Sequence, residues 1–214
     1  MAKYAGVSTS VIRRLPRYYR FLGDLLDRGV ERISSREFAD ITGLTASQIR
    51  QDLNCFGGFG QQGYGYNVET LHAEIGKILG VDKLRPSILI GAGNLGIAIA
   101  NHIIFEKRGF RLDAIFDSDR GKTGLKVRDW IVMHTDTLES YCHEHKPLIA
   151  LLCIPRQAAM ESVDCLIEYG IRGFWNFSHY DLSVRYKDKV AVENVHLGDS
   201  LMTLSFNVGE VLDD

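Results

Sequence analysis

The chain has 214 residues, of which 45% are hydrophobic and 24% are charged, with a net charge of -2. These values are typical of a soluble globular protein of one or two domains. Four cysteines without a C-x-x-C spacing favour a reducing compartment, so we expect a cytoplasmic protein. The longest apolar tract, residues 87–105, is interrupted by glycine, asparagine and histidine, which argues against a membrane span.

Charge is distributed unevenly along the chain. Residues 1–20 contain five cations and no acidic residue, although the whole chain is nearly neutral. A basic N-terminal segment of this kind predicts a polyanionic partner. A solvated N-terminus is the alternative that charge alone leaves open.

The first predicted helix spans residues 15–28. Leucine and tyrosine recur there at helical spacing, Pro16 occupies a plausible first helical position, and Gly29 ends the run. We therefore expect one amphipathic helix directly after the basic segment.

Two short helices joined at a glycine follow, which is the pattern of a helix-turn-helix. Ser34 and Glu37 predict a capping box at the start of the first of them, and Gly43 is expected to end it. Phe38 and Ile41 are expected to form its apolar face.

The second short helix is expected to begin after Thr45 as N-cap, with Gln48 three residues further on. Ile49, Leu53 and Phe56 lie at i, i+4 and i+7 and should face the core. The opposite side holds groups that bond base edges or phosphates in a major groove, although a plain solvated helix face is the alternative. The residues on that side are Ser47, Arg50, Gln51 and Asn54.

Residues 56–68 hold five glycines interleaved with Phe59, Tyr64 and Tyr66. Glycine permits tight turns and aromatic residues pair across strands, which predicts a β-hairpin, the wing of a winged helix, rather than a glycine-rich linker. Residues 1–81 are therefore predicted to form a winged-helix DNA-binding domain. Its expected DNA contacts are Arg13, Arg14, Arg17, Tyr18, Ser47, Gln48, Arg50, Gln51, Asn54, Gly60, Gly63 and Tyr64.

Residues 85–119 have the pattern of a βαβ unit. Gly91, Gly93 and Gly96 form a G-x-G-x-x-G between an expected strand and an expected helix. The first glycine allows a tight turn, the second lets backbone N–H groups approach a pyrophosphate, and the third lets the helix pack on the strand. The helix N-terminus adds partial positive charge for the phosphates.

The second strand of this unit is expected to end at Asp117, 21 residues after Gly96. A carboxylate at that position bonds both ribose hydroxyls and favours NAD(H) over NADP(H), whose 2′-phosphate it repels. Arg120 is close enough in sequence to offset that charge, so the preference stays open.

Further strand and helix signals complete a Rossmann-like parallel sheet over residues 82–196. Ligands bind beyond the carboxyl ends of such strands, so Ile154, Pro155, Asn176 and Phe177 are candidate cofactor contacts, with simple strand termination as the alternative. The histidines of residues 142–145 lie on different faces of an expected helix, so no metal site is expected there.

Residues 197–214 form an apolar helical stripe. Such a helix must bury its stripe on its own domain or on a partner subunit. Pairing fits the habit of helix-turn-helix proteins of binding palindromic DNA as twofold dimers, so we expect a homodimer and assign these residues to dimerisation.

In this order, the segments RLPRYYRFL, ISSREFAD, QIRQDL, FGGFGQQGYGY, IGAGNLG, FDSD, WNF and VENV resemble the family of redox-sensing transcriptional repressors called Rex, over essentially the whole chain. The resemblance implies a homodimer of winged-helix and Rossmann domains with a swapped C-terminal helix, and no catalytic residues. It also implies that the protein senses the NADH/NAD+ ratio, with NADH releasing it from palindromic operator DNA and NAD+ competing for the same site.

The resemblance also implies roles for individual residues. Asp117 would bind the adenosine ribose; Ile154 and Pro155 would line the path from adenine to nicotinamide, with Asn176 and Phe177 nearby. The pyrophosphate would lie on Gly91, Ala92, Gly93, Asn94, Leu95 and Gly96.

The chain departs from the family pattern at several positions. His102 stands where the family often has tyrosine, and His196-Leu197 stands where it often has Asp-Phe. The resemblance implies that the tyrosine and the aspartate belong to a hydrogen-bond switch near the nicotinamide. That switch communicates with an N-terminal arginine, which in this chain would be Arg13 or Arg14. Gln51 and Asn54 replace a common lysine and serine, so the operator sequence is expected to differ.

Two other functions remain open at this point. An NAD-dependent oxidoreductase would need a substrate domain, for which too few residues follow Gly96, and no catalytic set stands out. A repressor that senses another nucleotide, such as CoA, fits less well because Asp117 favours a free adenosine ribose.

Overall fold

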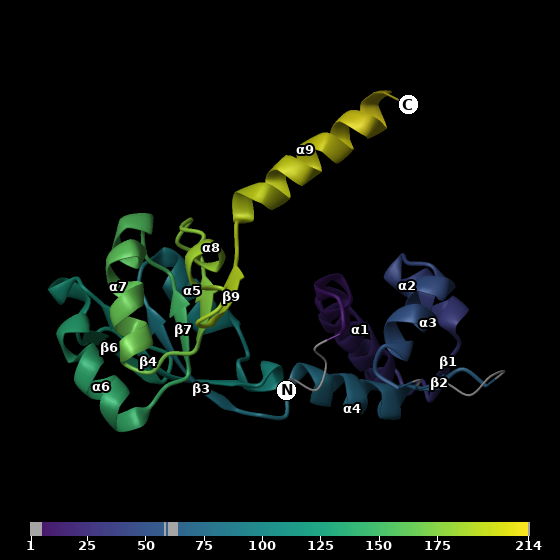
Figure 1. The fold of residues 1–214 in the computed structure, drawn as a ribbon, viewed down its shortest axis with the longest axis horizontal. Helices are drawn as coiled ribbons and strands as arrows, with labels where there is room; N and C mark the ends of the chain where they lie inside the picture. The colour runs from purple at the N-terminus through teal and green to yellow at the C-terminus, as the bar shows by residue number, and fades with distance from the viewer. Residues whose placement is uncertain (1–5, 58, 60–63, 214) are drawn as a thin grey trace. The chain divides into compact units, whose positions relative to one another are not determined.

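The computed structural model describes residues 6–57, 59 and 64–213, which form two compact units, one ending at Asp82 and one beginning at Lys83 (Figure 1). The predicted fold class is confirmed, because a helix-turn-helix unit precedes a largely parallel sheet flanked by helices. Gly60 and Gly63, two of the expected DNA contacts, lie outside the described residues.

Helix α1 spans Thr9–Asp27 and is longer than the sequence predicts. It begins six residues earlier because the side chain of Ser8 accepts a hydrogen bond from the N–H of Val11. Pro16 lies inside the helix and not at its start, which corrects the prediction. The helix continues past Pro16 because its apolar side is anchored by buried Val11, Leu15, Tyr18 and Leu22.

Helices α2 (Ser35–Thr42) and α3 (Ala46–Asn54) confirm the predicted caps. The capping box of Ser34 and Glu37 is complete, and Gly43 adopts a left-handed conformation at the end of α2. Ile41 was expected in the core but is exposed, because α2 buries Phe38, Ala39 and Thr42 instead.

The described part of the wing differs from the predicted hairpin. Strand β2 (Tyr66–Asn67) pairs antiparallel with β1 (Arg32–Ile33), which lies between α1 and α2 and not within residues 56–68. Tyr66 is buried against the helical core, whereas Tyr64 is exposed. Asn67 then caps α4 (Val68–Leu79), which completes the first unit.

The second unit is built on a seven-stranded sheet in the order β5-β6-β4-β3-β7-β8-β9. All neighbouring strands are parallel except β5 and β6. The order reverses between β3 and β7, as in dinucleotide-binding folds, where ligands bind at that switch point. The strands are β3 (Arg85–Ile90), β4 (Phe110–Asp117), β5 (Lys126–Val127), β6 (Trp130–His134), β7 (Ile149–Leu152), β8 (Gly173–Asn176) and β9 (Ala191–Asn194).

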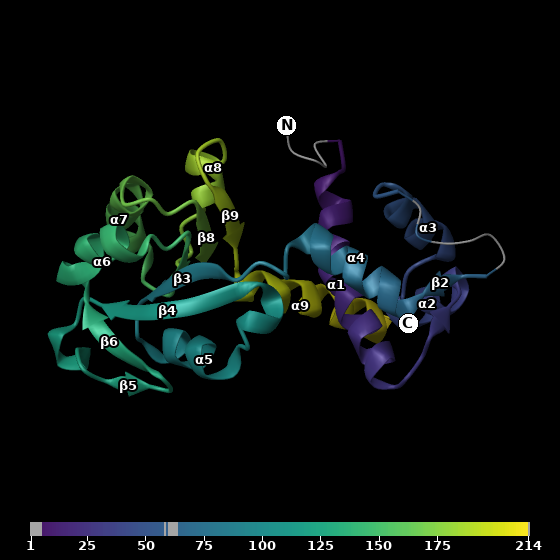
Figure 2. The same cartoon turned by 90° about the horizontal axis from the view of Figure 1, so that it is seen from below.

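Helices cover both faces of this sheet (Figure 2). Alternate residues of β3 divide the core: Ile88 and Ile90 pack with α6, α7 and α8, whereas Leu89 packs with α5. The sequence did not predict β5, β6 or α8. The helices are α5 (Asn94–His102), α6 (Leu138–His145), α7 (Arg156–Glu168) and α8 (Leu182–Tyr186), with 3-10 turns η1 (Glu106–Arg108), η2 (Arg120–Lys122) and η3 (Thr135–Thr137).

Helix α9 (Leu197–Asp213) follows β9 and confirms the predicted C-terminal helix (Figure 1). Its apolar side chains are exposed, including Leu201 at 69% and Phe206 at 68%. This helix therefore presents a large apolar surface that the described residues of a single chain leave uncovered.

The residues that the structure describes contain neither a membrane-spanning helix nor a cluster of metal-binding side chains. Within them, no helix has both the length and the hydropathy of a membrane span. Within the same ranges, no three His, Cys, Asp or Glu side chains gather closely enough to hold a metal ion.

Candidate functional site

The G-x-G-x-x-G turn lies at the carboxyl end of β3, at the switch point of the sheet. Gly91 has φ 105°, and a side chain there would meet the carbonyl oxygen of Cys153 at 2.4 Å. A Cβ on Gly96 would lie 1.9 Å from the carbonyl oxygen of Gly91. Both positions therefore require glycine for the turn itself, whatever ligand binds there.

Gly93 differs from its two neighbours in the motif. It is the N-cap of α5, supplies no side chain to cap the helix, and a Cβ there would meet nothing within 4 Å. Asn94 and Leu95 are exposed beside it in the first turn of α5. The first N–H groups of a helix have no partner within it, so this open corner is suited to a phosphate group.

Asp117 ends β4 beside this turn and shapes it directly. Its Oδ2 accepts a hydrogen bond from the N–H of buried Ala92 at 2.7 Å, and its Oδ1 accepts one from the N–H of Asp119 at 2.8 Å. Burial raises the pKa of this carboxyl, but the two N–H donors and Lys122 outweigh it and hold the pKa below its usual value. Oδ1 keeps acceptor capacity for a further donor such as a ribose hydroxyl.

The cation beside Asp117 is not the one that the sequence suggested. Lys122 Nζ lies 3.0 Å from Asp117 Oδ2, whereas Arg120 pairs with Asp136 at 2.6 Å. The turn η2 places Lys122 and not Arg120 on the side of the carboxylate. Lys122 is therefore the residue that offsets the charge of Asp117.

The ends of β7 and β8 place the other four predicted cofactor residues differently. Ile154 packs against the turn, because a Cβ on Gly91 would meet its Cγ2 at 2.8 Å, and Pro155 is exposed as the N-cap of α7. Phe177 is half-buried against Trp175. These three side chains stay candidate contacts beside the glycine turn.

The side chain of Asn176 has a structural role at the ends of two strands. Its side chain is fully buried; its Nδ2 donates to the carbonyl of Tyr180 and to Asn194, while its Oδ1 accepts from Ser178. The side chain thus joins the ends of β8 and β9. Every hydrogen-bonding group of the amide is engaged within the protein, so the expected contact with the cofactor stays a prediction that does not involve a hydrogen bond from this side chain.

The two histidines at the departures from the family pattern are not brought together within the chain. His102 is exposed at the C-terminal end of α5, away from the glycine turn that begins this helix. His196 lies just before α9 and stacks on His179, with ring centroids 5.8 Å apart.

On the first unit, α3 presents the surface that the sequence predicts. Its inward side buries Ile49 and Leu53. The outward side is exposed and consists of Ser47, Arg50, Gln51 and Asn54, with Arg13, Arg17 and Tyr64 exposed elsewhere on the same unit. This surface combines amide and guanidinium groups that can reach bases and phosphates.

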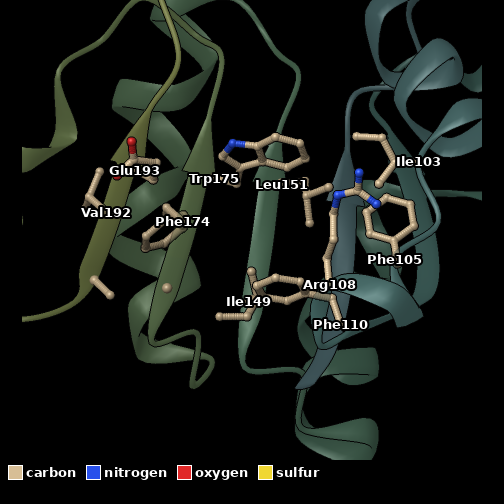
Figure 3. A pocket seen from close by; sticks show the side chains of 12 residues that line it. Ile103, Phe105, Arg108, Phe110, Ile149, Leu151, Phe174, Trp175, Val192 and Glu193 are labelled. Atoms are coloured by element: carbon tan, nitrogen blue, oxygen red, sulfur yellow. The ribbon is translucent and has the colours of Figure 1, made fainter. Parts of the chain in front are cut away.

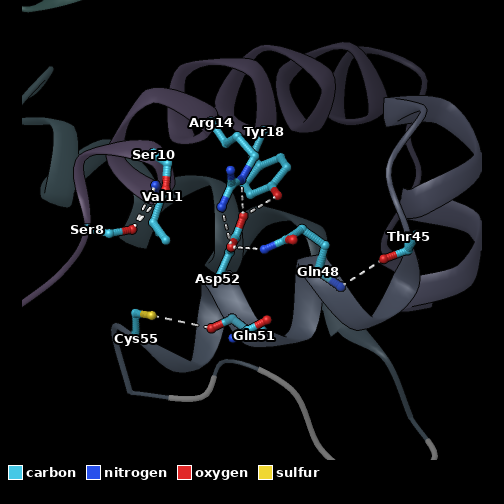
Figure 4. Close-up of polar contacts among 10 residues, drawn as sticks. All are labelled: Ser8, Ser10, Val11, Arg14, Tyr18, Thr45, Gln48, Gln51, Asp52 and Cys55. Atoms are coloured by element: carbon cyan, nitrogen blue, oxygen red, sulfur yellow. Dashed lines mark hydrogen bonds and ion pairs between the residues drawn. The ribbon is translucent and has the colours of Figure 1, made fainter.

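Three of the residues expected to contact DNA donate hydrogen bonds to the buried carboxylate of Asp52 instead (Figure 4). Tyr18 is fully buried and its hydroxyl donates to Asp52 at 2.6 Å, which corrects its assignment as a DNA contact. Arg14 is half-buried and forms two hydrogen bonds with the same carboxylate, which also receives one from Gln48. Asp52 is a residue that the sequence did not single out. The available signal was the spacing of 14 with 18 and of 48 with 52, each i and i+4, which places each pair on one side of a helix.

A separate hollow lies on the α5 face of β7, β8 and β9 (Figure 3). Its volume is about 490 Å³, and apolar side chains line most of it, including Phe105, Phe110, Ile149, Leu151 and Trp175. Residues of the glycine turn take no part in its lining. The hollow is therefore distinct from the open corner at Gly93 and Asp117. Its apolar lining is typical of a surface that packs against other apolar groups.

Comparisons with known proteins agree with both units. The family model "Putative DNA-binding protein N-terminus" matches residues 6–54, and the model "CoA binding domain" matches residues 82–180. The chain is 56% identical to the redox-sensing transcriptional repressor Rex of Clostridioides difficile (strain 630), over 95% of this chain and 96% of the relative. The Rex protein of Clostridium beijerinckii is 50% identical over 98% of this chain and 99% of its own.

Solved structures give the same result. The crystal structure of RSP in complex with β-NAD+ and operator DNA has a TM-score of 0.88 and 55% identity, covering 95% of this chain and 93% of that chain. RSP in complex with β-NADH has a TM-score of 0.87 and 52% identity, covering 96% of each chain. With this identity over nearly its whole length and with the glycine turn in place, the chain belongs to the Rex family of redox-sensing transcriptional repressors.

Proposed function

We propose that this protein is a cytoplasmic transcriptional repressor that binds palindromic operator DNA as a homodimer and leaves it when NADH binds. The observation that supports this most directly is the combination, in one chain, of an exposed recognition surface on α3 and an open nucleotide corner at Gly93 beside Asp117. One related RSP structure is a complex with NAD+ and operator DNA, and another is a complex with NADH.

Discrimination between the two redox states follows from their charge. The nicotinamide ring is neutral in NADH and positively charged in NAD+. A nicotinamide pocket with few polar groups therefore favours NADH, since burying an unpaired charge is costly. NADH must also bind the DNA-free dimer better than the DNA-bound one, and DNA must then weaken NADH by the same factor.

The function does not require a chemical step. The residues around the glycine turn bind and orient a dinucleotide, and burial raises the pKa of the nearby Cys153 thiol to about 12, so this thiol is not a nucleophile at neutral pH. We therefore propose that NADH is a signal and not a substrate. An oxidoreductase would instead consume NADH with a carbonyl substrate.

The first test is a titration of the protein with NADH, followed by the fluorescence of Trp130 and Trp175, and then displacement by NAD+. Tighter binding of NADH than of NAD+, without turnover, would support the redox sensor. CoA serves as the comparison ligand. Tight binding of CoA with no binding of NADH would favour a repressor that senses a different nucleotide.

Substitution of Gln51 tests the assignment of α3 as the recognition helix. Gln51→Ala should lower affinity for the preferred duplex by about tenfold and relax base preference at one position, because a bidentate contact to a base is lost. Binding of fluorescent duplexes with each base varied in turn would measure both effects. Gln157→Ala on α7, in the other unit, is the matched control; unchanged base preference in Gln51→Ala would contradict the assignment.

The proposed homodimer rests on two apolar surfaces. One is the exposed stripe of α9, and the other is the hollow on the α5 face of β7 to β9 (Figure 3). Apolar patches of this extent normally mark association sites. We propose that α9 of one subunit packs on the partner, in agreement with the swapped helix that the family resemblance implies.

Charge on the α9 stripe should separate the subunits. Leu201→Glu combined with Leu204→Glu places two carboxylates where apolar burial is expected, so the dimer should dissociate. Sedimentation velocity would measure the change in mass. Thr203→Glu adds a charge beside the stripe and should leave the dimer intact; a double variant that stays dimeric would contradict this role of α9.

A further inference from the structure

The carboxylate of Asp52 is the polar centre of the first unit (Figure 4). It is fully buried and receives four hydrogen bonds. Oδ2 accepts from Arg14 Nε and from the Tyr18 hydroxyl, both at 2.6 Å. Oδ1 accepts from Arg14 Nη2 at 2.8 Å and from Gln48 Nε2 at 2.7 Å. Every usual acceptor direction of the carboxylate is thus occupied.

The four residues of this network come from two helices. Arg14 and Tyr18 lie one turn apart on α1, and Gln48 and Asp52 lie one turn apart on α3. The network therefore joins α1 to the helix that exposes the predicted DNA-reading side chains. A bidentate pair with a guanidinium fixes direction as well as distance, so it restricts the rotation and tilt of α3 relative to α1.

We infer that Asp52 is a positioning residue for DNA recognition: through Arg14 and Tyr18 it holds α3 in the orientation in which its exposed face reads bases. The inference rests on the proposed DNA-binding function and adds to it a residue that touches no DNA. It also changes the role of Arg14, whose Nε and Nη2 are used inside the unit and are not offered to a phosphate.

Electrostatics supports a role in orientation more than in stability. Burial raises the pKa of Asp52, but the hydrogen bonds from Arg14, Tyr18 and Gln48 outweigh it, and the pKa lies below its usual value. The acid is therefore charged near neutral pH. A buried ion pair contributes little net stability compared with apolar packing of the same volume, and its best-supported benefit is a defined arrangement of the elements that it joins.

Removing the charge of Asp52 should change DNA affinity in opposite directions, depending on whether the carboxylate acts through net charge or through the position of α3. A general electrostatic view predicts stronger DNA binding by Asp52→Asn, because one negative charge is removed from a DNA-binding unit. The positioning role predicts weaker binding of the preferred duplex by about tenfold, within the range of couplings inside one hydrogen-bonded network. The affinity for a shuffled duplex should change little. The preference ratio, which is the affinity for the preferred duplex divided by the affinity for the shuffled duplex, therefore falls.

Arg14 is tested by the salt dependence of binding. Loss of one phosphate contact reduces the slope of log affinity against log salt by about 0.9. Arg14→Gln should lower the preference ratio without changing this slope, whereas Arg13→Gln, at the exposed neighbouring position, should reduce the slope. A smaller slope in Arg14→Gln together with an unchanged preference ratio would show a phosphate contact and overturn the inference.

The experiment uses the full-length protein and a duplex that the wild type selects from a random pool. Circular dichroism first establishes that each variant is folded. Tyr18→Phe removes one hydrogen bond and keeps the ring, so it remains informative if Asp52→Asn does not fold; it should lower the preference ratio about threefold. Thr42→Val, which removes a buried hydrogen bond within α2 only, is the control for general destabilisation.

The outcomes distinguish a failure of the positioning role of Asp52 from a failure of the proposed DNA-binding function. A reduced preference ratio in Asp52→Asn, or in Tyr18→Phe if the first does not fold, with an unchanged ratio in Thr42→Val, supports the positioning role. Equal ratios in wild type and folded network variants overturn it while leaving DNA binding intact. If the wild type selects no duplex at all, the proposed DNA-binding function fails, and the positioning role fails with it.

Discussion

Gly93→Ala should leave the protein folded and lower its affinity for NADH by roughly a hundredfold. A methyl group at this position meets nothing within 4 Å among the atoms of the protein, so the turn itself tolerates it. The same methyl group would occupy the corner where backbone N–H groups meet the pyrophosphate. Losing two hydrogen bonds to a charged group costs about 3 kcal/mol, which corresponds to roughly a hundredfold in affinity.

The measurement is an NADH titration alongside a thermal unfolding curve. Gly23→Ala makes the same chemical change inside α1, where the added methyl meets only His72 at an ordinary 3.6 Å, and should bind NADH normally. The Gly93 variant should also stay on the preferred duplex at NADH concentrations that release the wild type. Normal NADH affinity in a folded Gly93→Ala would place the dinucleotide elsewhere.

Asp117→Asn is expected to lower NADH affinity by roughly thirtyfold and to reduce the preference for NADH over NADPH. The amide keeps the size of the carboxyl group but presents an N–H₂ where Ala92, Asp119 and Lys122 all donate. A lost charged acceptor costs about 2 kcal/mol, or roughly thirtyfold in affinity. Lys122 would also lose its partner and could then pair with a 2′-phosphate.

The carboxylate of Asp117 should also affect how the free energy of unfolding depends on pH. Because the folded pKa of Asp117 is lowered, its stabilising contribution is present above the unfolded pKa of about 3.9 and is lost as the pH falls through the folded pKa. The stability difference between wild type and Asp117→Asn should therefore shrink on acidification. Asp119→Asn, which affects only the exposed cap of the next turn, is the control for both measurements. If the ratio of NADH affinity to NADPH affinity is unchanged in Asp117→Asn, the assignment of Asp117 to the ribose is contradicted.

Local signals in the sequence account for the parts of the structure that were predicted correctly. The caps of α2 and α3 depend on Ser34, Glu37 and Thr45, whose partners lie three residues away. The glycine turn and Asp117 follow from spacing within a single βαβ unit. Such features need no knowledge of distant segments, so the chain alone indicates them.

The features that the sequence analysis missed depend on contacts between distant segments. Strand β2 pairs with β1, more than thirty residues earlier, and Pro16 is kept inside α1 by the burial of that helix. Tyr18 and Asn176 were assigned to ligands because their positions suited one, but each is fully engaged within the protein. Whether a polar side chain points outward is decided by tertiary packing, which single-sequence patterns do not determine.

The cation beside Asp117 also depends on tertiary packing, since the sequence suggested Arg120 and the structure has Lys122 there. Both cations lie within five residues of Asp117, so sequence distance alone does not separate them. The turn η2 and the acceptor offered by Asp136 draw Arg120 away and leave Lys122 on the carboxylate. The glycine turn and the carboxylate beside it were therefore predicted correctly, while the cation closest to that carboxylate was not.

NADH is proposed to control the binding of operator DNA by this protein. The most direct test is the affinity of the full-length protein for its selected duplex, measured by fluorescence anisotropy without nucleotide, with NAD+ and with NADH. We expect that NADH weakens DNA binding, that NAD+ does not, and that the duplex weakens NADH binding by the same factor. Equal DNA affinity in all three conditions, with NADH shown to be bound, would contradict this proposal.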